Sequence, residues 1–563
     1  MSQESATGLR RDMAAALLLV ALAAAAYIPA LGAGFVWDDD HYVTENATLR
    51  EAGGLWRIWF EIGAVPQYYP LVHSSFWLEY RLWGLHPAGF HTVNVLLHAL
   101  SGIVLWRLLR RLSVPGAWVA AAVFLLHPVH VESVAWITAR KNVLSGLFYL
   151  LAASAWVRSR NRERLFQPAV LGLFLLALAS KTITASLPVA LLIVTWWKRG
   201  RIGREAWSTL PMFVVGATAG LFTVWMERNF VGAVGARWSL DFVERGLVAG
   251  RALWFYLEKL VWPHPLLFIY PRWTIDAGSL VAWLYPLGAV AAIAGLWAAR
   301  RRLGRGPFAA ALFFTATLGP ALGFLNVYPM RYSFVADHFQ YLASIGPICL
   351  AVGALAHLSR SNPRLGRVAA ALVLLLFGSL TWRHARDFED AESLWTATLV
   401  GNPQAHIARN NLGGEKLRQS SLASDAAERE RLLQEARTHL EIAAGVDYPE
   451  AHNNLGIVLH RLGRPAEAVE HYRTALSIQP RFADAANNLG ISIAELGRLE
   501  EATRYFAEAV RIDPLLASAR YNLAAALVRL GRREEALPHL DALERIDPRN
   551  ASARQLRQQV RVP

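Results

Sequence analysis

The sequence predicts an all-α protein in two parts, a transmembrane helical domain at 1–382 and a solenoid of helical repeats at 383–563. Two observations predict this division. The long apolar runs lie almost entirely in the first part, and a pattern that recurs every 34 residues lies in the second. The chain of 563 residues is 54% hydrophobic and 18% charged, whereas a soluble domain is about 25% charged. A single soluble domain, a fibrous chain and a disordered chain are therefore excluded.

The first predicted span is the apolar run 13–35, which follows Arg10 and Arg11. A cleaved signal peptide is the alternative, because Ala-rich sequence continues to Ala33. The run is longer than the roughly 7–15-residue core of a signal peptide, and it is long enough to cross about 30 Å of hydrocarbon. We therefore expect an uncleaved first helix with a cytoplasmic N-terminus, so that the chain from Trp37 onward emerges outside the cytoplasm.

Further apolar runs bring the predicted number of spans to about 11. They lie at about 92–110, 116–134, 143–157, 167–180, 183–197, 209–226, 279–299, 307–327, 339–358 and 368–382. Residues 242–262 are also apolar, but they contain Arg251 and Glu258, and a charge at mid-bilayer costs about 2.5–3.5 kcal/mol. We read this segment as an amphipathic helix on the outer surface. Basic loops such as 300–305 and 360–367 then all face the cytoplasm, and the C-terminal part lies outside it.

The C-terminal part contains an internal repeat. Asn454, Asn488 and Asn522 are each followed by Leu and are spaced 34 residues apart. This pattern resembles the tetratricopeptide repeat, a helical hairpin of the same length. Full repeats are expected at about 450–483, 484–517 and 518–551, and an insertion-bearing repeat at about 405–449. Repeat packing explains the Asn and Tyr residues of the array, and the concave face of such an array is a site for a protein or peptide.

Several classes of site are absent from the sequence. The single cysteine, Cys349, excludes a disulfide framework, a redox pair and a thiolate zinc site. No P-loop, Rossmann glycine pattern, HExxH or GxSxG motif occurs. The net charge of +14 is explained by the basic loops, so no nucleic acid partner is needed. No cofactor is required either, and the energy for any chemistry must come with the substrate.

An acidic triplet, Asp38, Asp39 and Asp40, directly follows the first predicted helix. Carboxylates at the outer face suit a general base that deprotonates a hydroxyl at the membrane surface. Asp38 and Asp39 would also be the ligands of a divalent cation, if one binds. A solvated acidic exit from a helix is the alternative.

A second stretch contains His127, His130 and Glu132 at the outer end of the third span. These side chains are candidates for a polar pocket. They are weak candidates for a metal site, because Pro128 interrupts the helix between them and no fourth ligand is evident.

Basic side chains follow at the same predicted depth. Arg140 and Lys141 lie where they could hold a lipid phosphate, although interfacial snorkelling is the alternative. Lys181 lies between two apolar runs and is costly if dry. Arg331, Asp337 and His338 lie in the last outer loop, where they could complete the pocket.

Three segments carry a resemblance to a known family. They read YYPLVHSSFWLEYRLWGLHPAGFHTVNVLLHAL, LLHPVHVESVAWITARKNVLSG and VADHFQYLASIG, and the repeats follow them. In this order they resemble the transmembrane and tetratricopeptide repeat-containing O-mannosyltransferases, which belong to the GT-C glycosyltransferases. The resemblance implies a polytopic enzyme that moves a sugar from a polyprenyl-phosphate donor to Ser or Thr hydroxyls.

The resemblance also implies roles for single residues. The family's first-loop acidic pair maps onto Asp38 and Asp39, which makes them the expected catalytic residues. Its basic residue after the HPVH-type motif maps onto Arg140, and its Ser-Lys turn maps onto Lys181. His338 stands where relatives have an arginine, so Arg331 is the expected compensating contact to the donor phosphate.

The sequence as a whole predicts an inverting protein O-glycosyltransferase that moves mannose or another hexose on the outer face, with the repeats binding the acceptor. Its partners would be the polyprenyl-phosphate sugar, the acceptor protein and membrane lipids. The Arg- and Ala-rich composition favours a bacterial inner membrane. A GT-C enzyme acting on a lipid or glycan, and a non-enzymatic membrane-anchored scaffold, are the alternatives.

Overall fold

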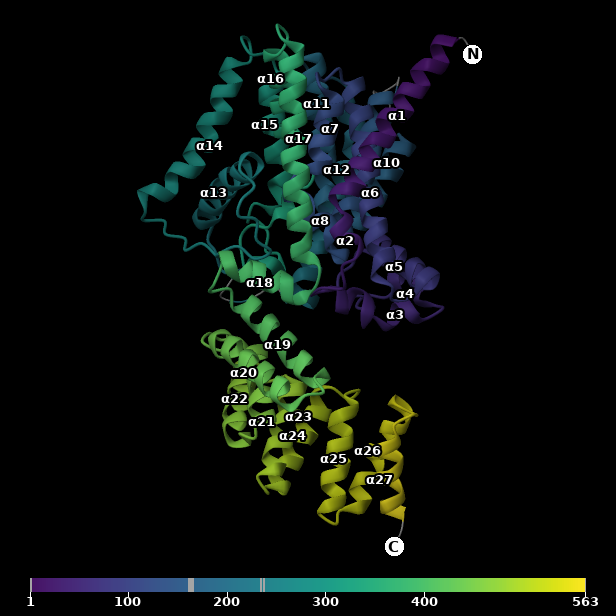
Figure 1. Ribbon diagram of the computed structural model, residues 1–563, viewed down its shortest axis with the longest axis vertical. Helices are drawn as coiled ribbons and strands as arrows, with labels where there is room; N and C mark the ends of the chain where they lie inside the picture. Colours follow the sequence, from purple (N-terminus) through teal and green to yellow (C-terminus); the bar gives the residue numbers. More distant parts are fainter. Residues whose placement is uncertain (1–2, 160–166, 233–234, 236–237, 562–563) are drawn as a thin grey trace. The chain divides into compact units, whose positions relative to one another are not determined.

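The computed structural model describes residues 3–159, 167–232, 235 and 238–561, and no strand occurs in those ranges (Figure 1). The predicted all-α class is therefore confirmed. The chain divides into two compact units, Met1–Asn402 and Pro403–Pro563. Residues 383–402, which follow the predicted domain boundary, are part of the first unit.

The first unit contains eighteen α-helices and several shorter turns within its described residues. The helices are α1 (Gln3–Ala26), α2 (Ile28–Leu31), α3 (Ala47–Arg50), α4 (Gly54–Phe60), α5 (Pro70–Trp83), α6 (Pro87–Arg111), α7 (Ala117–Leu126), α8 (Val131–Ala135), α9 (Arg140–Arg158), α10 (Pro168–Ser180), α11 (Leu187–Arg199), α12 (Glu205–Met226), α13 (Phe242–Val261), α14 (Leu280–Ala299), α15 (Gly306–Leu318), α16 (Ile345–Leu358), α17 (Pro363–Ala385) and α18 (Ala391–Gly401). The short turns that matter for the site are η1 (Asp40–Thr44), η2 (Pro128–His130), η3 (Ile137–Ala139), η4 (Thr182–Ser186), η5 (Glu227–Val231), η8 (Tyr328–Arg331) and η9 (Asp337–Gln340).

Four of the described helical segments are long and apolar enough to cross a membrane. They are Pro87–Arg111, Ala206–Val231, Leu280–Ala299 and Pro363–Phe388. A fifth span results if α7 and Pro128–Ala135, which are bent by 56°, are counted together. Three shorter apolar helices accompany them, so the first unit is a multi-pass membrane unit. The count of about 11 spans stays a prediction.

The bend after α7 has a local cause. His127 takes an extended conformation, with φ −73° and ψ 124°, directly before Pro128. Proline disfavours helical backbone in the residue that precedes it, so α7 cannot run on. The chain resumes in η2, α8 and η3 before α9 begins at Arg140. This broken path gives the segment between α7 and α9 the irregular backbone that brings polar groups inside the unit.

The predicted helix at 242–262 is confirmed as α13, and its position on the outer surface stays a prediction. The Asp241 carboxylate caps its N-terminus by accepting a hydrogen bond from the Glu244 backbone at 2.8 Å, and the Glu244 carboxylate accepts one from the Asp241 backbone at 2.9 Å. Such reciprocal capping satisfies two of the free N–H groups that begin every helix.

The second unit is a series of helical hairpins. Its helices are α19 (His406–Leu422), α20 (Ala426–Ala443), α21 (Pro449–Arg461), α22 (Pro465–Ile478), α23 (Ala483–Glu495), α24 (Leu499–Ile512), α25 (Ala517–Arg529), α26 (Arg533–Ile546) and α27 (Ala551–Arg561). Within two hairpins a glycine faces an aromatic ring. A Cβ at Gly456 would lie 2.6 Å from Cε1 of Tyr472, and one at Gly490 would lie 2.6 Å from Cε1 of Phe506. The repeated glycine therefore permits the close approach of the two helices.

Asparagine side chains join successive hairpins. Asn488 Nδ2 donates to Asn453 Oδ1 at 3.0 Å, and Asn522 Nδ2 donates to Asn487 Oδ1 at 2.9 Å. These bonds give the recurrent Asn-Asn pair a packing role between repeats.

Candidate functional site

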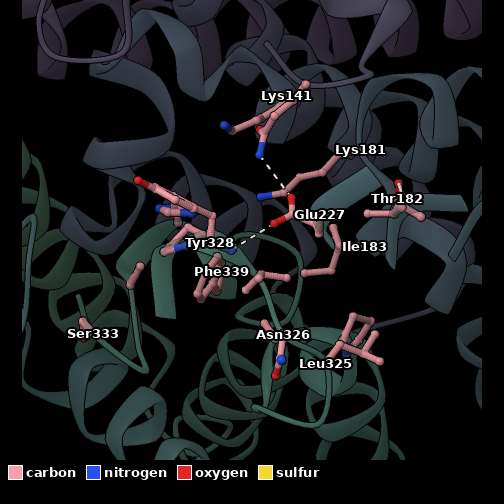
Figure 2. Close-up of a pocket in the computed structure, with 18 of the residues that line it drawn as sticks. Lys141, Lys181, Thr182, Ile183, Glu227, Leu325, Asn326, Tyr328, Ser333 and Phe339 are labelled. Carbon is pink, nitrogen blue, oxygen red and sulfur yellow. Dashed lines mark hydrogen bonds between the residues drawn. The ribbon is translucent and has the colours of Figure 1, made fainter. Parts of the chain in front are cut away.

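A cavity of about 270 Å³ lies in the first unit, and its lining combines charged and apolar side chains (Figure 2). Most of the wall is apolar, with Ile183, Leu325 and Phe339 among its members. The ionisable groups on it, drawn from six separate segments of the chain, are Asp38, Glu132, Lys141, Lys181, Glu227, His338 and the phenols of Tyr69, Tyr328 and Tyr332. An apolar pocket with a few convergent polar groups is typical of a binding or active site.

Only one of the two predicted catalytic carboxylates lines this cavity. Asp38 does, and among the described residues no hydrogen-bond donor holds its carboxylate. Burial raises the pKa of Asp38 above its usual value, and the nearby ammonium of Lys141 opposes that rise. Asp38 is thus a carboxylate beside a cation, free to accept a proton from a bound group.

Asp39 is fully buried and has a different task. Its Oδ1 accepts hydrogen bonds from the Thr138 backbone at 2.8 Å and from the Thr138 hydroxyl at 2.5 Å, and its Oδ2 accepts one from the Val36 backbone at 2.9 Å. Burial raises the pKa of Asp39 to about 7, although these bonds oppose the shift. A pKa near 7 suits a general base, but both oxygens of Asp39 are already occupied. Asp39 therefore ties the first loop to η3, while Asp40 is exposed to solvent.

Two lysines supply positive charge to the cavity. The ammonium of Lys141 lies 5.2 Å from the ring centre of Tyr42, 5.7 Å from that of Tyr69 and 5.4 Å from that of Trp136. Ring faces attract a cation without using its hydrogen-bond donors, so the ammonium of Lys141 keeps donors for a ligand.

Lys181 is the second cation, and its side chain is buried, with 9% exposure. Its Nζ donates to Asn142 Oδ1 at 2.6 Å. Burial, together with the charge of Lys141, lowers the pKa of Lys181 to about 7. An anion bound between the two lysines would relieve this repulsion.

Glu132 and His338, predicted as pocket members, are brought together on the cavity wall. His338 Nδ1 lies 2.7 Å from Glu132 Oε1, and the His338 backbone donates to Glu132 Oε2 at 2.9 Å. The carboxylate of Glu132 therefore fixes the backbone and ring of η9. Asp337 points away to Tyr270, whose hydroxyl donates to it at 3.0 and 3.1 Å, and it does not line the cavity.

Arg140, the predicted phosphate contact, lies outside the cavity lining. Its side chain is fully buried in a bidentate ion pair with Glu79, and it also donates to Asn94 and to the Phe90 carbonyl. The neighbouring Lys141 faces the cavity instead. Arg140 and Lys141 are consecutive residues in the first turn of α9, so their side chains point in different directions. Only the ammonium of Lys141 can therefore reach a ligand in the cavity.

The remaining predicted residues lie around the cavity but do not line it. His127 Nε2 is 3.0 Å from the Leu260 carbonyl, and His130 Nε2 is hydrogen-bonded to the Ser344 hydroxyl at 3.1 Å. Arg331 Nη1 donates to the Tyr328 hydroxyl at 3.2 Å. Within the ranges that the structure describes, no group of three His, Cys, Asp or Glu side chains is placed to hold a metal ion.

Glu227 is a member of the site that the sequence patterns did not reveal. It begins η5, a single π-helical turn at the end of α12. Its Oε1 accepts from Gln67 Nε2 at 3.2 Å, and its Oε2 accepts from the Tyr328 backbone at 3.0 Å (Figure 2). The available signal was an acid that directly follows an apolar run, which is costly unless it is paired or functional.

Comparison with known proteins supports the resemblance seen in the sequence. Family models described as tetratricopeptide repeat match residues 449–482 and 494–560. Protein O-mannosyl-transferase F38B6.6 of Caenorhabditis elegans is 24% identical over 444 residues, which are 73% of this chain and 61% of that protein. Protein O-mannosyl-transferase TMTC3 of Homo sapiens is 24% identical over 530 residues, which are 82% of this chain and 55% of that protein. The chain resembles the TMTC protein O-mannosyl-transferases.

The chain spans less than two thirds of the length of these relatives. Among solved structures, YrrB, a TPR protein with an unusual peptide-binding site, is 23% identical over 37% of this chain and 99% of that chain, with a TM-score of 0.25.

Proposed function

We propose that the protein is a membrane glycosyltransferase that moves a sugar, mannose or another hexose, from a polyprenyl-phosphate donor to Ser or Thr hydroxyls of proteins. The observation that carries the proposal is the cavity itself, in which the Asp38 carboxylate and the ammonium groups of Lys141 and Lys181 face one apolar space. The names of the TMTC relatives supply the reaction class, and the cavity supplies groups for each of its steps.

The chemistry follows from the charges. The acceptor hydroxyl attacks the anomeric carbon, and Asp38 takes its proton as the new C–O bond forms. The bond from the anomeric carbon to the phosphate oxygen breaks, and the lipid phosphate leaves with the bonding electrons. Lys141 and Lys181 stabilise that negative charge. One direct displacement inverts the anomeric configuration, as in a GT-C enzyme.

The donor would bring its own leaving group, which removes the need for a nucleotide motif. Its apolar chain would contact wall residues such as Ile183, Leu325 and Phe339. Arg140 would act indirectly, by fixing α9 so that Lys141 faces the phosphate. A divalent cation at Asp38 is compatible with this scheme, and Asp39 has no oxygen left to share one.

The setting of the reaction is part of the same proposal. The active cavity would open on the outer face of a bacterial inner membrane, with the N-terminus in the cytoplasm and the repeats outside it. The repeat array would bind the acceptor protein, in keeping with the use of such arrays as peptide-binding surfaces.

The test is sugar transfer by the purified full-length protein in nanodiscs. Polyprenyl-phosphate mannose and a Ser/Thr peptide are supplied, and the glycopeptide is measured by mass spectrometry. We expect Asp38→Asn to lower the transfer rate by about 10²–10⁴, the usual contribution of a general base. Asp40→Asn, an exposed acid two residues away, is the matched control and should keep most of the activity. Absence of transfer with every polyprenyl-phosphate sugar offered would contradict the proposal.

A further inference from the structure

A second pocket adjoins the cavity and shares part of its wall. It has a volume of about 440 Å³ and is lined by Asp38, His41, Tyr42, Glu45, Pro66, Gln67, Val231 and Tyr328. Three of these residues, Asp38, Gln67 and Tyr328, also line the first cavity. The side chains of His41 and Glu45 are 73% and 66% exposed, so this pocket opens to solvent.

The shared wall is held by one carboxylate. Gln67 Nε2 and the Tyr328 backbone both donate to Glu227, at 3.2 and 3.0 Å. The Tyr42 hydroxyl donates to Gln67 Oε1 at 2.6 Å, so both ends of the Gln67 amide are bonded. Bonded on both sides, the Gln67 amide forms a fixed partition, and Asp38 lies beside it in contact with both spaces.

The two spaces differ in the charges that they offer. Lys141 and Lys181 line the first cavity and are absent from the second, whose lining has the carboxylates of Asp38 and Glu45 and the imidazole of His41. In a direct displacement the entering hydroxyl and the leaving phosphate lie on opposite sides of the anomeric carbon. The base therefore approaches the anomeric carbon from the side away from the phosphate, and Asp38 lines both spaces.

We propose that this second pocket binds the acceptor, as an extended peptide segment whose Ser or Thr reaches Asp38 and whose neighbouring residue is basic. The inference rests on the proposed function for the transfer step, and it adds the acceptor subsite and its charge preference. Two carboxylates face one imidazole there, so a lysine or arginine beside the hydroxyl residue is attracted and an acidic residue is repelled. A volume of about 440 Å³ is within the roughly 300–1,000 Å³ range of small-ligand sites.

The first experiment measures binding of fluorescent Ser peptides to the full-length protein without donor. Two peptides are identical except for Lys or Glu next to the Ser. We expect the wild type to bind the Lys peptide about two- to five-fold more tightly, the effect of one exposed ion pair. Glu45→Lys should reverse that order. Glu61→Lys is the matched control, because Glu61 is also an exposed acid four residues from its ion-pair partner and lines neither space.

The second experiment measures two-substrate kinetics. His41→Trp should fill the mouth of the second pocket and raise the acceptor KM about ten-fold or more, while the donor KM stays unchanged. Since His41 is exposed, the variant should fold as the wild type does, and its thermal unfolding checks this.

The outcomes separate the inference from the proposed function. Transfer that proceeds with the same acceptor KM and the same charge preference in Glu45→Lys and His41→Trp as in the wild type would overturn the inference alone. Charge-selective peptide binding that Glu45→Lys reverses, together with no transfer of sugar, would support the peptide site and contradict the proposed function. Absence of peptide binding in the wild type would overturn the inference.

Discussion

The two units differ in the burial of their ion pairs. In the repeat unit, an exposed ion pair recurs at the same position of three hairpins, Arg464 with Glu467, Arg498 with Glu501 and Arg532 with Glu535. The membrane unit also has exposed pairs, such as Arg57 with Glu61, but it buries the pair of Arg140 and Glu79, whose side-chain exposures are 0% and 5%. Exposed pairs contribute little to stability, whereas breaking a buried pair is costly. The comparison shows that the repeats are held by apolar packing, and that the membrane unit depends on single buried charges.

The largest expected difference is between two arginines. Arg140→Met should lower the free energy of unfolding by about 3–5 kcal/mol, because it leaves the buried Glu79 without a partner. Arg464→Met removes an exposed partner of Glu467 and should cost less than about 1 kcal/mol. Thermal unfolding of the first unit can be followed by tryptophan fluorescence, since every Trp precedes residue 403. Hydrogen exchange reports on the repeats.

If Arg140→Met and Arg464→Met lowered the free energy of unfolding equally, the buried ion pair would matter no more than the exposed one, and the account would be contradicted. The double variant Arg140→Met with Glu79→Gln sharpens the comparison. Removal of both charges should recover part of the stability, because the unpaired carboxylate is then absent.

The next effect is within the repeats and concerns packing alone. Gly490→Leu should destabilise its hairpin by about 1–3 kcal/mol, because even a Cβ there would lie 2.6 Å from the Phe506 ring. Faster hydrogen exchange of the α23 amides would show this. Ser477→Leu, at an exposed site of the array, is the control. Gly463 and Gly497 are unsuitable as controls, because their positive φ angles would strain a leucine backbone whatever the packing. Unchanged exchange in Gly490→Leu would contradict the packing account.

In the membrane unit, the rate of sugar transfer is expected to depend on pH. Burial lowers the pKa of Lys181 to about 7, so its ammonium is present below that pH and lost above it. The kcat/KM for the donor should therefore fall above about pH 7, by at most ten-fold per pH unit. Lys181→Arg keeps its charge and should abolish the fall, whereas Lys198→Arg, outside the cavity, should not. A profile that is flat from pH 6 to 9 in the wild type would contradict a phosphate contact by Lys181.

The smallest effect tests the asparagine bonds between hairpins. Asn488→Ala removes the donor to Asn453 and should cost about 1 kcal/mol. Hydrogen exchange of α21 and α23 is the measurement. A loss as large as that of Gly490→Leu would show that polar bonds, and not apolar packing, dominate the array.

The difference between the units also explains what could be predicted. The repeat array was predictable because the same helix-to-helix contact recurs along the sequence. Gly456 faces Tyr472 in one hairpin, and Gly490 faces Phe506 in the same way in the next. In the membrane unit, Asp38 and Lys181 were found because a charge beside an apolar run is costly and therefore conspicuous.

Other parts of the site were beyond the sequence patterns. Gln67 donates a hydrogen bond to Glu227 although 160 residues separate them, and no local sequence pattern indicates such a contact. Arg140 and Lys141 were both expected at phosphate depth, and the resemblance selected Arg140, whereas only Lys141 lines the cavity. The direction in which each side chain of a first helical turn points cannot be fixed from sequence. The different tasks of Asp38 and Asp39 depend on Thr138, which lies 99 residues away from Asp39.

The central claim is that two adjacent carboxylates divide the work, Asp38 as the base and Asp39 as the anchor of the loop. The most direct test measures sugar transfer and thermal unfolding of Asp38→Asn and Asp39→Asn side by side. We predict that Asp38→Asn unfolds like the wild type but transfers about 10²–10⁴ times more slowly. Asp39→Asn should lose about 1–3 kcal/mol of stability, because its amide cannot accept all three bonds. An Asp38→Asn protein that transfers sugar at the wild-type rate would contradict the account.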